Sequence, residues 1–415
     1  MSDRPLRLVV LANMISMLGS GMNAAAVVWY VLQVTHSEVS LGKLLVLQTL
    51  PALLLLPFSG VIIDREDRRH LVMLFDLARG AMVLVVAVVA IRGQVQLWHL
   101  YVMTVLVAAG FWLFWPTVTA LLQELTPGAE FVRTNTLLLG GVQAGWLIAG
   151  SVVGFLYNHI GLGWILVIDF ATYVLSFSCY LMVRKGRVTV QPVSSAAATA
   201  TLGAWEKYWH ELKEGVLYIK ARPNVLLLGT SWALFVGAML TQGAVTAPLS
   251  DRILHAGAVG YGWLNGGWGV GAFLSVFYSP LLIARWKSRR AAGYSLGLLA
   301  FFIFLAPYSR VVPIAVALYI IMGSGRGTGG TALSSEMMEL IPKHFMGRVL
   351  NTFYLTGTVL QLGLSMAVAE VAHRSSLAAA FAMIAAVYAV ACVSAILPEA
   401  EPGPAPVVMA EAAGE

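Results

Sequence analysis

Five ionisable side chains lie within long apolar stretches of this sequence, where each could do chemistry: Asp76, Arg79, Asp169, Arg326 and Glu336. A charge at the centre of a bilayer costs at least about 2.5 to 3.5 kcal/mol on insertion scales, so such a residue usually has a partner or faces a water-filled cavity. A carboxylate in that setting can bind and release protons, and a cation can hold an anionic or carbonyl-rich ligand. The three acidic residues are therefore candidate proton-coupling residues, and Arg326 is a candidate ligand contact.

The acidic residues also have structural interpretations. Asp76 and Arg79 are three residues apart and share one side of a helix, which favours a structural ion pair over proton coupling. Asp169 could change its protonation as a cavity alternates between water and protein, or it could fix the start of its helix by hydrogen bonding.

Arg326 lies in a glycine-rich segment, residues 323–330. Glycines around a cation leave space for a ligand or let the helix bend. The alternative is that Arg326 is buried against a carboxylate such as Glu336 or Asp169. The sequence leaves both interpretations open.

A charged turn, residues 60–69, follows the second apolar stretch and contains an aspartate with three arginines close behind it. Such a cluster at a membrane surface can bind a helix terminus or carboxylates elsewhere and hold one face of the protein closed. The alternative is that the basic residues only fix the orientation of the chain. The residues with a predicted gating role are Gly60, Asp64, Arg65, Arg68 and Arg69, with Gly347 and Arg348 as a weaker counterpart in the second half.

Apolar helices are needed to position these residues, and the composition predicts them. Hydrophobic residues make up 59% of the chain and charged residues only 11%, well outside the averages of soluble domains. A bilayer crossing needs about 20 mostly apolar residues. The sequence predicts twelve such spans: residues 6–33, 40–63, 70–92, 97–124, 133–158, 162–184, 224–248, 258–284, 290–308, 312–336, 347–372 and 375–397.

The longest polar segment separates six spans from six. We therefore predict an all-α polytopic membrane protein with a six-helix bundle at 1–184, a cytoplasmic central loop at 185–223, a second six-helix bundle at 224–397 and a disordered cytoplasmic tail at 398–415. In the central loop, Trp205, Trp209, Leu212 and Val216 recur at helical spacing with charges opposite. This pattern predicts an amphipathic helix on the inner membrane surface, with a simple linker helix as the alternative.

Basic residues are distributed unevenly between alternate loops. With the N-terminus inside, 19 of the 26 Lys and Arg residues lie on the cytoplasmic side and five on the other side. Both termini are therefore expected in the cytoplasm, and the net charge of +6 fits anionic lipid better than nucleic acid. Cys179 and Cys392 both lie in apolar stretches without a nearby partner, so we expect no disulfide, metal site or bound cofactor.

The sequence resembles the major facilitator superfamily, whose signature turn has the form Gly, three residues, Asp, Arg, any residue, Gly, Arg, Arg. Residues 60–69 match it except that Asp67 replaces the second Gly, and Asp tolerates a left-handed turn better than most residues. The resemblance is closest to bacterial siderophore exporters and macrolide-type drug exporters. It rests on Phe114-Trp115-Pro116, on residues 169–173 and 212–219, and on Gly347-Arg348-Val349.

This resemblance implies two six-helix bundles around a central cavity lined by the first, fourth, seventh and tenth helices. It implies a gating role for the signature turn, which stabilises the state open to the outside. It also places Arg326 at the cavity. The other polar or aromatic candidates for substrate contact near the middle of these helices, each also compatible with simple packing, are Asn23, Trp112, Trp115, Trp232 and Gln242.

A secondary exporter of an amphipathic small molecule, such as a drug or siderophore, explains these features best. We expect a monomer in the bacterial inner membrane that is driven by proton antiport and works by alternating access. Its partners would be the substrate, protons and membrane lipids, and not nucleic acid. An importer or a lysophospholipid flippase on the same fold is the alternative. The sequence has no His-Glu-x-x-His, Gly-x-Ser-x-Gly or phosphate-binding loop motif, which disfavours an enzyme or a primary pump.

Overall fold

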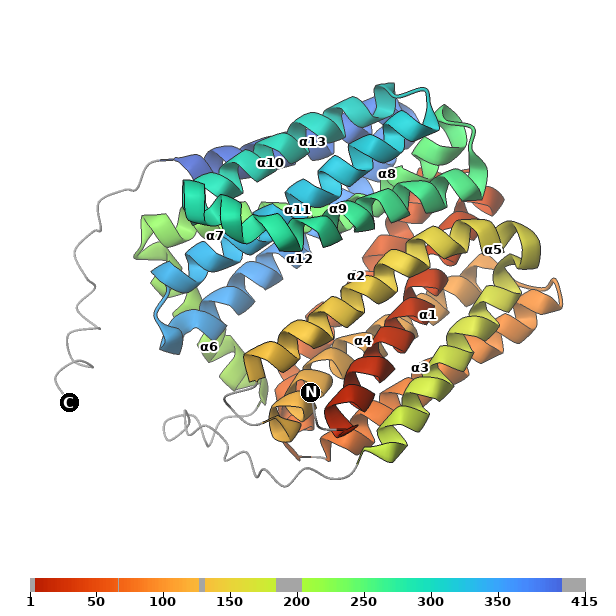
Figure 1. Ribbon diagram of the computed structural model, residues 1–415, viewed down its shortest axis with the longest axis horizontal. Helices are drawn as coiled ribbons and strands as arrows, with labels where there is room; N and C mark the ends of the chain where they lie inside the picture. Colours follow the sequence, from red (N-terminus) through yellow and green to blue (C-terminus); the bar gives the residue numbers. More distant parts are fainter. Residues whose placement is uncertain (1–3, 66, 127–130, 184–203, 398–415) are drawn as a thin grey trace.

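Long helices form almost the whole molecule in the computed structural model, which describes residues 4–65, 67–126, 131–183 and 204–397. These ranges contain no β-strand (Figure 1). The elements are α1 (Arg4–Thr35), α2 (Glu38–Arg65), α3 (Arg68–Ile91), α4 (Leu97–Leu125), α5 (Phe131–Met182), α6 (Ala204–Lys220), α7 (Pro223–Thr241), α8 (Gly243–Pro248), the π-helical turn η2 (Leu249–Ile253), α9 (Gly257–Trp286), α10 (Ser288–Leu305), the 3-10 turn η3 (Ala306–Tyr308), α11 (Val312–Leu340), α12 (Lys343–Arg374) and α13 (Leu377–Ile396).

The lengths and compositions of these helices fit a membrane protein. Ten of the described helical segments are long and apolar enough to cross a bilayer. Among them α5 counts once, although it consists of two helical parts that meet at Gly161, where φ is 71° and only glycine is unstrained. The ten do not include α11, which carries Arg326 and two glutamates. Its 29 residues nevertheless extend about 40 Å, which is long enough to cross a bilayer. The all-helical fold is confirmed, and twelve spans are reached when both parts of α5 and α11 are counted.

The predicted spans coincide with helices to within a few residues at most ends. The span predicted at 97–124 corresponds to α4, and the break predicted after residue 158 corresponds to the bend at Gly161. The seventh span continues further than predicted, because α8 and η2 extend α7 to Ile253. The predicted tail at 398–415 and residues 184–203 of the central loop lie outside the described residues.

The helices form two groups that lie side by side in Figure 1. We call α1–α5 the N-terminal half and α7–α13 the C-terminal half. One large hydrophobic core lies mainly in the C-terminal half, and two smaller ones lie mainly in the N-terminal half, with Ala247, Ala258 and Tyr261 of the C-terminal half joining one of them. We call the end of the molecule that carries α6 and the first turn of α3 the α6 end. The opposite end, where α1 ends, α2 begins and η2 lies, is the far end.

The two halves approach each other closely at the far end. A Cβ atom at Gly154 of α5 would lie 2.5 Å from the carbonyl oxygen of Ala258 and 2.9 Å from the Cα atom of Gly262, both in α9. A Cβ atom at Gly42 of α2 would lie 2.7 Å from the Cβ atom of Ala369 in α12. These distances leave no room for a side chain, so small residues permit the close contact between the halves.

The linker helix α6 packs against the start of α12. The carboxylate of Glu214 lies 2.9 Å from the guanidinium of Arg348, and the rings of Tyr218 and Phe345 stack with centroids 4.6 Å apart. Trp205 and Trp209 are half exposed and contact each other edge to face. The predicted amphipathic helix is thus present, but one of its faces binds the C-terminal half. Its position on the membrane surface remains a prediction.

Candidate functional site

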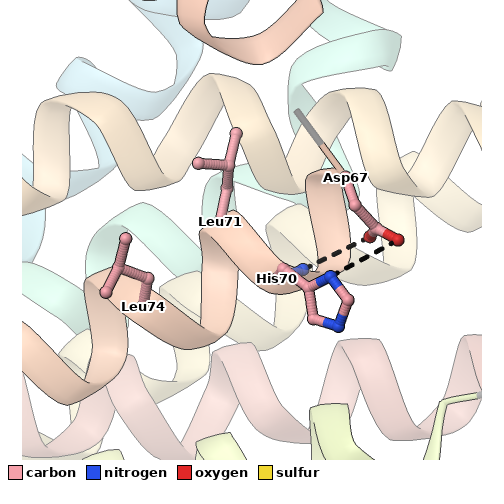
Figure 2. A pocket seen from close by; sticks show the side chains of 4 residues that line it. All are labelled: Asp67, His70, Leu71 and Leu74. Carbon is pink, nitrogen blue, oxygen red and sulfur yellow. Dashed lines mark hydrogen bonds and ion pairs between the residues drawn. The ribbon is translucent and has the colours of Figure 1, made fainter. Parts of the chain in front are cut away.

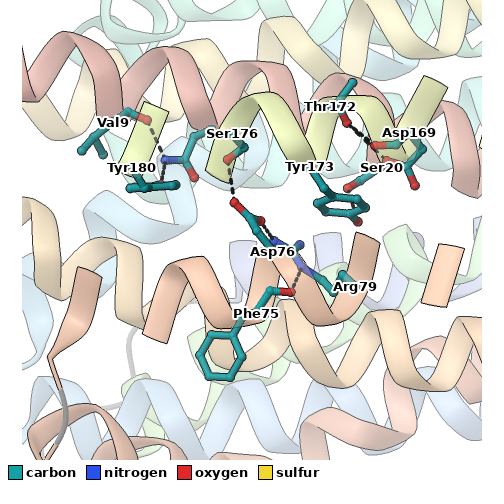
Figure 3. A network of polar contacts seen from close by, with 11 residues as sticks. Val9, Ser20, Phe75, Asp76, Arg79, Asp169, Thr172, Tyr173, Ser176 and Tyr180 are labelled. Atoms are coloured by element: carbon teal, nitrogen blue, oxygen red, sulfur yellow. Dashed lines mark hydrogen bonds and ion pairs between the residues drawn. The ribbon is translucent and has the colours of Figure 1, made fainter. Parts of the chain in front are cut away.

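A network of buried polar side chains joins three helices of the N-terminal half (Figure 3). The guanidinium of Arg79 donates a hydrogen bond to Asp76 at 2.5 Å, and the hydroxyl of Ser176 donates to the same carboxylate at 2.7 Å. All three side chains are buried. The predicted pair between Asp76 and Arg79 is therefore present, and it is linked to the second part of α5. A proton-coupling role for Asp76 stays a prediction.

Aromatic rings enclose the cation of this network. The guanidinium carbon of Arg79 lies 4.2 Å from the ring centroid of Phe114 in α4 and 4.7 Å from that of Tyr173 in α5. Ring faces attract a cation that has lost its water. The pair of Asp76 and Arg79 is thus held from three helices, and α3 cannot move far without breaking these contacts.

The second buried carboxylate, Asp169, has neutral partners. The amide of Asn23 in α1 donates to it at 2.7 Å, and the hydroxyl of Thr172 donates to the backbone carbonyl of the same residue at 2.7 Å. None of the cations that the structure describes forms an ion pair with Asp169, which is fully buried. The idea that this carboxylate fixes the start of its helix is wrong, because Asp169 lies eight residues beyond Gly161 and bonds across to α1.

Arg326 of α11 is the corresponding cation in the C-terminal half, and it is partly buried. Its Nε donates to the sulfur of Met239 in α7 at 2.9 Å, and its guanidinium carbon lies 4.4 Å from the ring centroid of Trp268 in α9. No carboxylate of the described residues pairs with it. Glu336, also buried, is ten residues further along the same helix, about 15 Å away. The interpretation that Arg326 is buried against Glu336 or Asp169 is therefore wrong.

The glycines around Arg326 serve close packing. A Cβ atom at Gly323 would overlap the carbonyl oxygen of Trp268, and one at Gly327 would overlap the hydroxyl of Ser275. Both partners belong to α9, whose backbone fills the space beside Gly323 and whose Ser275 side chain fills the space beside Gly327. The prediction that this glycine-rich segment leaves room for a ligand is wrong at these two positions.

The remaining candidates for substrate contact have different surroundings. Trp112 of α4 packs edge to face on Tyr354 of α12, with centroids 5.9 Å apart, and so touches the opposite half. Trp115 and Trp232 pack against the cores of their own halves, and Gln242 is buried at the end of α7. With Asn23 bonded to Asp169, the candidates do not form one cluster. Their roles as substrate contacts stay predictions.

The part of the signature turn that the structure describes binds within the N-terminal half. Asp67 caps α3 by accepting hydrogen bonds from the backbone N–H groups of Arg69 at 3.0 Å and His70 at 3.3 Å. Its φ of −65° and ψ of 112° are extended, so the left-handed turn considered for this residue is not formed. The side chain of Arg69 donates to the carbonyls of Tyr180 and Leu181 at the end of α5. A basic residue is favourable at a helix C-terminus.

Arg68 completes these contacts with a pair to Glu124 of α4, at 3.6 Å. Beside the turn lies a depression of about 500 Å³ lined by Asp67, His70, Leu71 and Leu74 (Figure 2). Leu74 is largely exposed, so the depression is on the outer surface of the helix group, away from the buried charges. Of the other gating candidates, Gly60, Asp64 and Arg65 lie in the last turns of α2 and Gly347 lies in the first turns of α12. Their contacts lie outside the described part of the structure. Arg348 contacts α6 instead of the N-terminal half.

One charged cluster at the far end was missed by sequence reasoning. Glu38, in the first turn of α2, is fully buried and forms an ion pair with Arg252 of η2, whose side chain is 41% exposed. His373, at the end of α12, lies 3.6 Å from the same carboxylate, and Arg252 also donates to the carbonyl of His36 at 2.9 Å. We call Glu38, Arg252 and His373 the far-end cluster. This cluster joins the two halves. It could not be predicted from the sequence, because an acidic residue in the first turn of a helix is common.

Two groups of apolar helices, with ionisable residues enclosed in each, define a polytopic membrane protein. The family model described as the Major Facilitator Superfamily matches residues 9–367. The chain therefore belongs to this superfamily and is a transporter rather than an enzyme, as the resemblance of the signature turn predicted.

Individual relatives are distant but extend over most of the chain. The multidrug efflux pump Tap of Mycolicibacterium fortuitum is 24% identical, with 83% of each chain covered. Macrolide efflux protein A of Streptococcus pyogenes is 22% identical, with 84% of each covered. Among solved structures, a bacterial homologue of the iron transporter ferroportin in an inward-facing state has a TM-score of 0.76 and 16% identity, covering 95% of this chain and 98% of that chain. The last likeness shows the fold alone.

Proposed function

We propose that this transporter is a proton-coupled exporter of an amphipathic small molecule, such as a drug or a siderophore. It acts as a monomer in the bacterial inner membrane, with the α6 end and both termini in the cytoplasm. The excess of basic residues in the loops of that end supports the orientation. Export is supported by two distant relatives, which are a multidrug efflux pump and a macrolide efflux protein.

The observation that carries proton coupling is the difference between the two buried aspartates. Asp76 is matched by the cation of Arg79, and protonating it would break an ion pair that three helices enclose. Asp169 is held by an amide and a hydroxyl, so it can gain or lose a proton without breaking an ion pair. Its amide partner, Asn23, comes from α1. Protonation therefore changes the hydrogen bond between α1 and α5, which is a direct way to bias the position of α1.

Alternating access is supported by the uneven contacts between the halves. The far-end cluster and the close approach of Gly154 to α9 join the halves at the far end. Arg68 and Arg69 contact only the N-terminal half. With the α6 end in the cytoplasm, this arrangement is a state closed to the outside. Transport would require the far-end contacts to break while contacts at the α6 end form.

Proteoliposomes with an imposed pH gradient test this proposal. We would screen iron-chelating siderophores, macrolides and lysophospholipids, with and without an uncoupler. Movement of one class against its gradient, abolished by the uncoupler, is the expected result. Movement that ignores the gradient would instead indicate facilitated diffusion or lipid flipping, and accumulation in the opposite direction would indicate an importer.

A variant separates proton coupling from general damage. Asp169→Asn keeps the size of the side chain and mimics the protonated acid, so it should lose accumulation driven by the pH gradient. It should retain exchange of labelled for unlabelled substrate, because exchange needs no net proton movement. Glu370→Gln is the matched control, since it makes the same acid-to-amide change in a solvent-exposed ion pair at the end of α12. Full pH-driven accumulation by Asp169→Asn would exclude this residue as the coupling site.

A further inference from the structure

The cation of Arg326 has no paired carboxylate among the described residues, unlike the cation of Arg79 in the N-terminal half. Arg79 is paired with Asp76, whereas Arg326 contacts a sulfur atom and a ring face among the described residues. Its two terminal amino groups have no hydrogen-bond partner among the described residues. Because Arg326 is partly buried, these donors are reachable yet poorly hydrated, and a guanidinium in that state gains strongly from an anion.

Two further donors near this cation are also without partners. The indole N–H of Trp268 is buried and makes no hydrogen bond within the described structure. The hydroxyl of Tyr388 in α13 is likewise buried without a partner there, and its ring packs edge to face on Phe235 of α7, the helix whose Met239 contacts Arg326. Most buried polar groups are hydrogen-bonded, so unsatisfied groups gathered around one cation call for a physical explanation.

The chemistry of these groups selects the ligand. The guanidinium and the indole can only donate hydrogen bonds, and the hydroxyl of Tyr388 is free to donate. Three donors without an acceptor suit an oxyanion. The ring of Trp268 and the thioether of Met239 add an apolar, polarisable surface beside the cation. The ligand therefore combines a carboxylate or sulfonate-like group with an apolar, preferably aromatic, body.

We infer that Arg326, Trp268 and Tyr388 form an oxyanion-binding subsite of the C-terminal half that selects substrates carrying an anionic group on an apolar body. This inference rests on the proposed function, since it names the class of the exported molecule. It uses no property of the N-terminal half, where the proton site is proposed, so binding and coupling are separate.

Equilibrium binding of two matched fluorescent probes tests this subsite. We would use 1-anilinonaphthalene-8-sulfonate, which is anionic, and N-phenyl-1-naphthylamine, which has the same rings without the sulfonate. Both are titrated onto the full chain in nanodiscs of zwitterionic lipid, with empty discs as background. Arg326→Gln should weaken binding of the sulfonate about tenfold to a hundredfold, the range for lost hydrogen bonds to a charged group. Binding of the neutral probe should stay within about twofold.

Further variants keep the test decisive. Tyr388→Phe should weaken only the sulfonate, by about twofold to tenfold. Arg326→Lys keeps the charge without the planar fork and should fall between Arg326→Gln and the parent chain. Arg92→Gln makes the same charge change in an exposed loop and should leave both probes unaffected.

Several results would overturn the inference: equal losses for both probes in Arg326→Gln, no loss for the sulfonate, or no binding of the sulfonate to the parent chain. If Arg326→Gln does not fold, the selective effect of Tyr388→Phe decides. Because no gradient is imposed, a selective loss for the sulfonate would stand even if transport proved independent of protons. Failure of the proposed function is thus distinguishable from failure of the subsite.

Discussion

Replacing Arg252 with Gln should open the far end of the transporter. The substitution removes the guanidinium that pairs with the fully buried carboxylate of Glu38. It also removes the hydrogen bond from this side chain to the carbonyl of His36. Of the basic side chains that the structure describes, His373 alone then faces the carboxylate, at 3.6 Å, and it is charged only when protonated. A buried carboxylate without a full counter-charge gains by reaching water, which it can do only if the halves separate.

The size of the effect follows from these contacts. Two unit charges about 4 Å apart attract by about 4 kcal/mol at an effective dielectric constant of 20. Because the side chain of Arg252 is 41% exposed, solvent screening reduces this to roughly 2 kcal/mol. Loss of the hydrogen bond to the carbonyl adds about 1 kcal/mol. The closed state should therefore lose about 3 kcal/mol, which changes the ratio of closed to open molecules by roughly a hundredfold.

The partner substitution should have a smaller effect. Glu38→Gln removes the attraction but also the cost of burying a carboxylate, and the exposed guanidinium can turn to water. We expect a change of no more than about 1 kcal/mol. In the double variant Glu38→Gln/Arg252→Gln, the ratio of closed to open molecules should return close to that of Glu38→Gln alone. This order of effects is specific to a buried carboxylate opposed by an exposed cation.

Distances between spin labels would measure the opening. Arg92, in the loop between α3 and α4, and Arg310, just before α11, are exposed positions at the far end of opposite halves. Both would be replaced by labelled cysteine in a chain whose Cys179 and Cys392 are changed to alanine. Electron–electron resonance should show mainly one shorter distance in the parent and a growing longer one in Arg252→Gln. A larger opening in Glu38→Gln than in Arg252→Gln would refute the reasoning.

Two further substitutions probe the packing that supports the site. Arg79→Met should lower the free energy of unfolding by about 3 to 5 kcal/mol, because it leaves Asp76 buried without its cation. Adding Asp76→Asn should recover most of this loss, and thermal unfolding in detergent measures both effects. Gly154→Val should favour the open far end by about 1 to 3 kcal/mol in the spin-label assay, because its side chain collides with Ala258 of α9, whereas Gly140→Val, which has open space, should not. An unchanged distance distribution in Gly154→Val would contradict the close contact.

The buried ionisable residues show which contacts local sequence patterns can predict. The pair of Asp76 and Arg79 was predictable because a spacing of three places two side chains on one side of any helix. The bond between Asn23 and Asp169 was not predictable, since the two residues are 146 positions apart and belong to different helices. Both were named as candidates for separate reasons, and only the packing of α1 on α5 brings them together.

The glycines and the far-end cluster show the limits of sequence patterns. A glycine-rich segment allows either open space or close packing, and beside Gly323 and Gly327 the space is filled by the backbone and a serine side chain of α9. Glu38 and Arg252 lie more than 200 residues apart, one in a first helical turn and the other in a π-helical turn. Charged residues at such positions do not by themselves indicate a long-range ion pair. Their pairing depends on how the two halves meet.

By itself, the sequence determined that this chain consists of membrane-spanning helices, roughly where each begins and ends, and to which superfamily it belongs. These properties depend on the transfer of short segments from water to lipid and on local turn chemistry, and both are set by neighbouring residues. Only the tertiary structure decided that Asp169 has neutral partners, that Arg326 has no carboxylate partner within the described chain and that Glu38 joins the halves. Such contacts depend on which helix faces meet, and the meeting of faces is fixed by the shapes of all helices together.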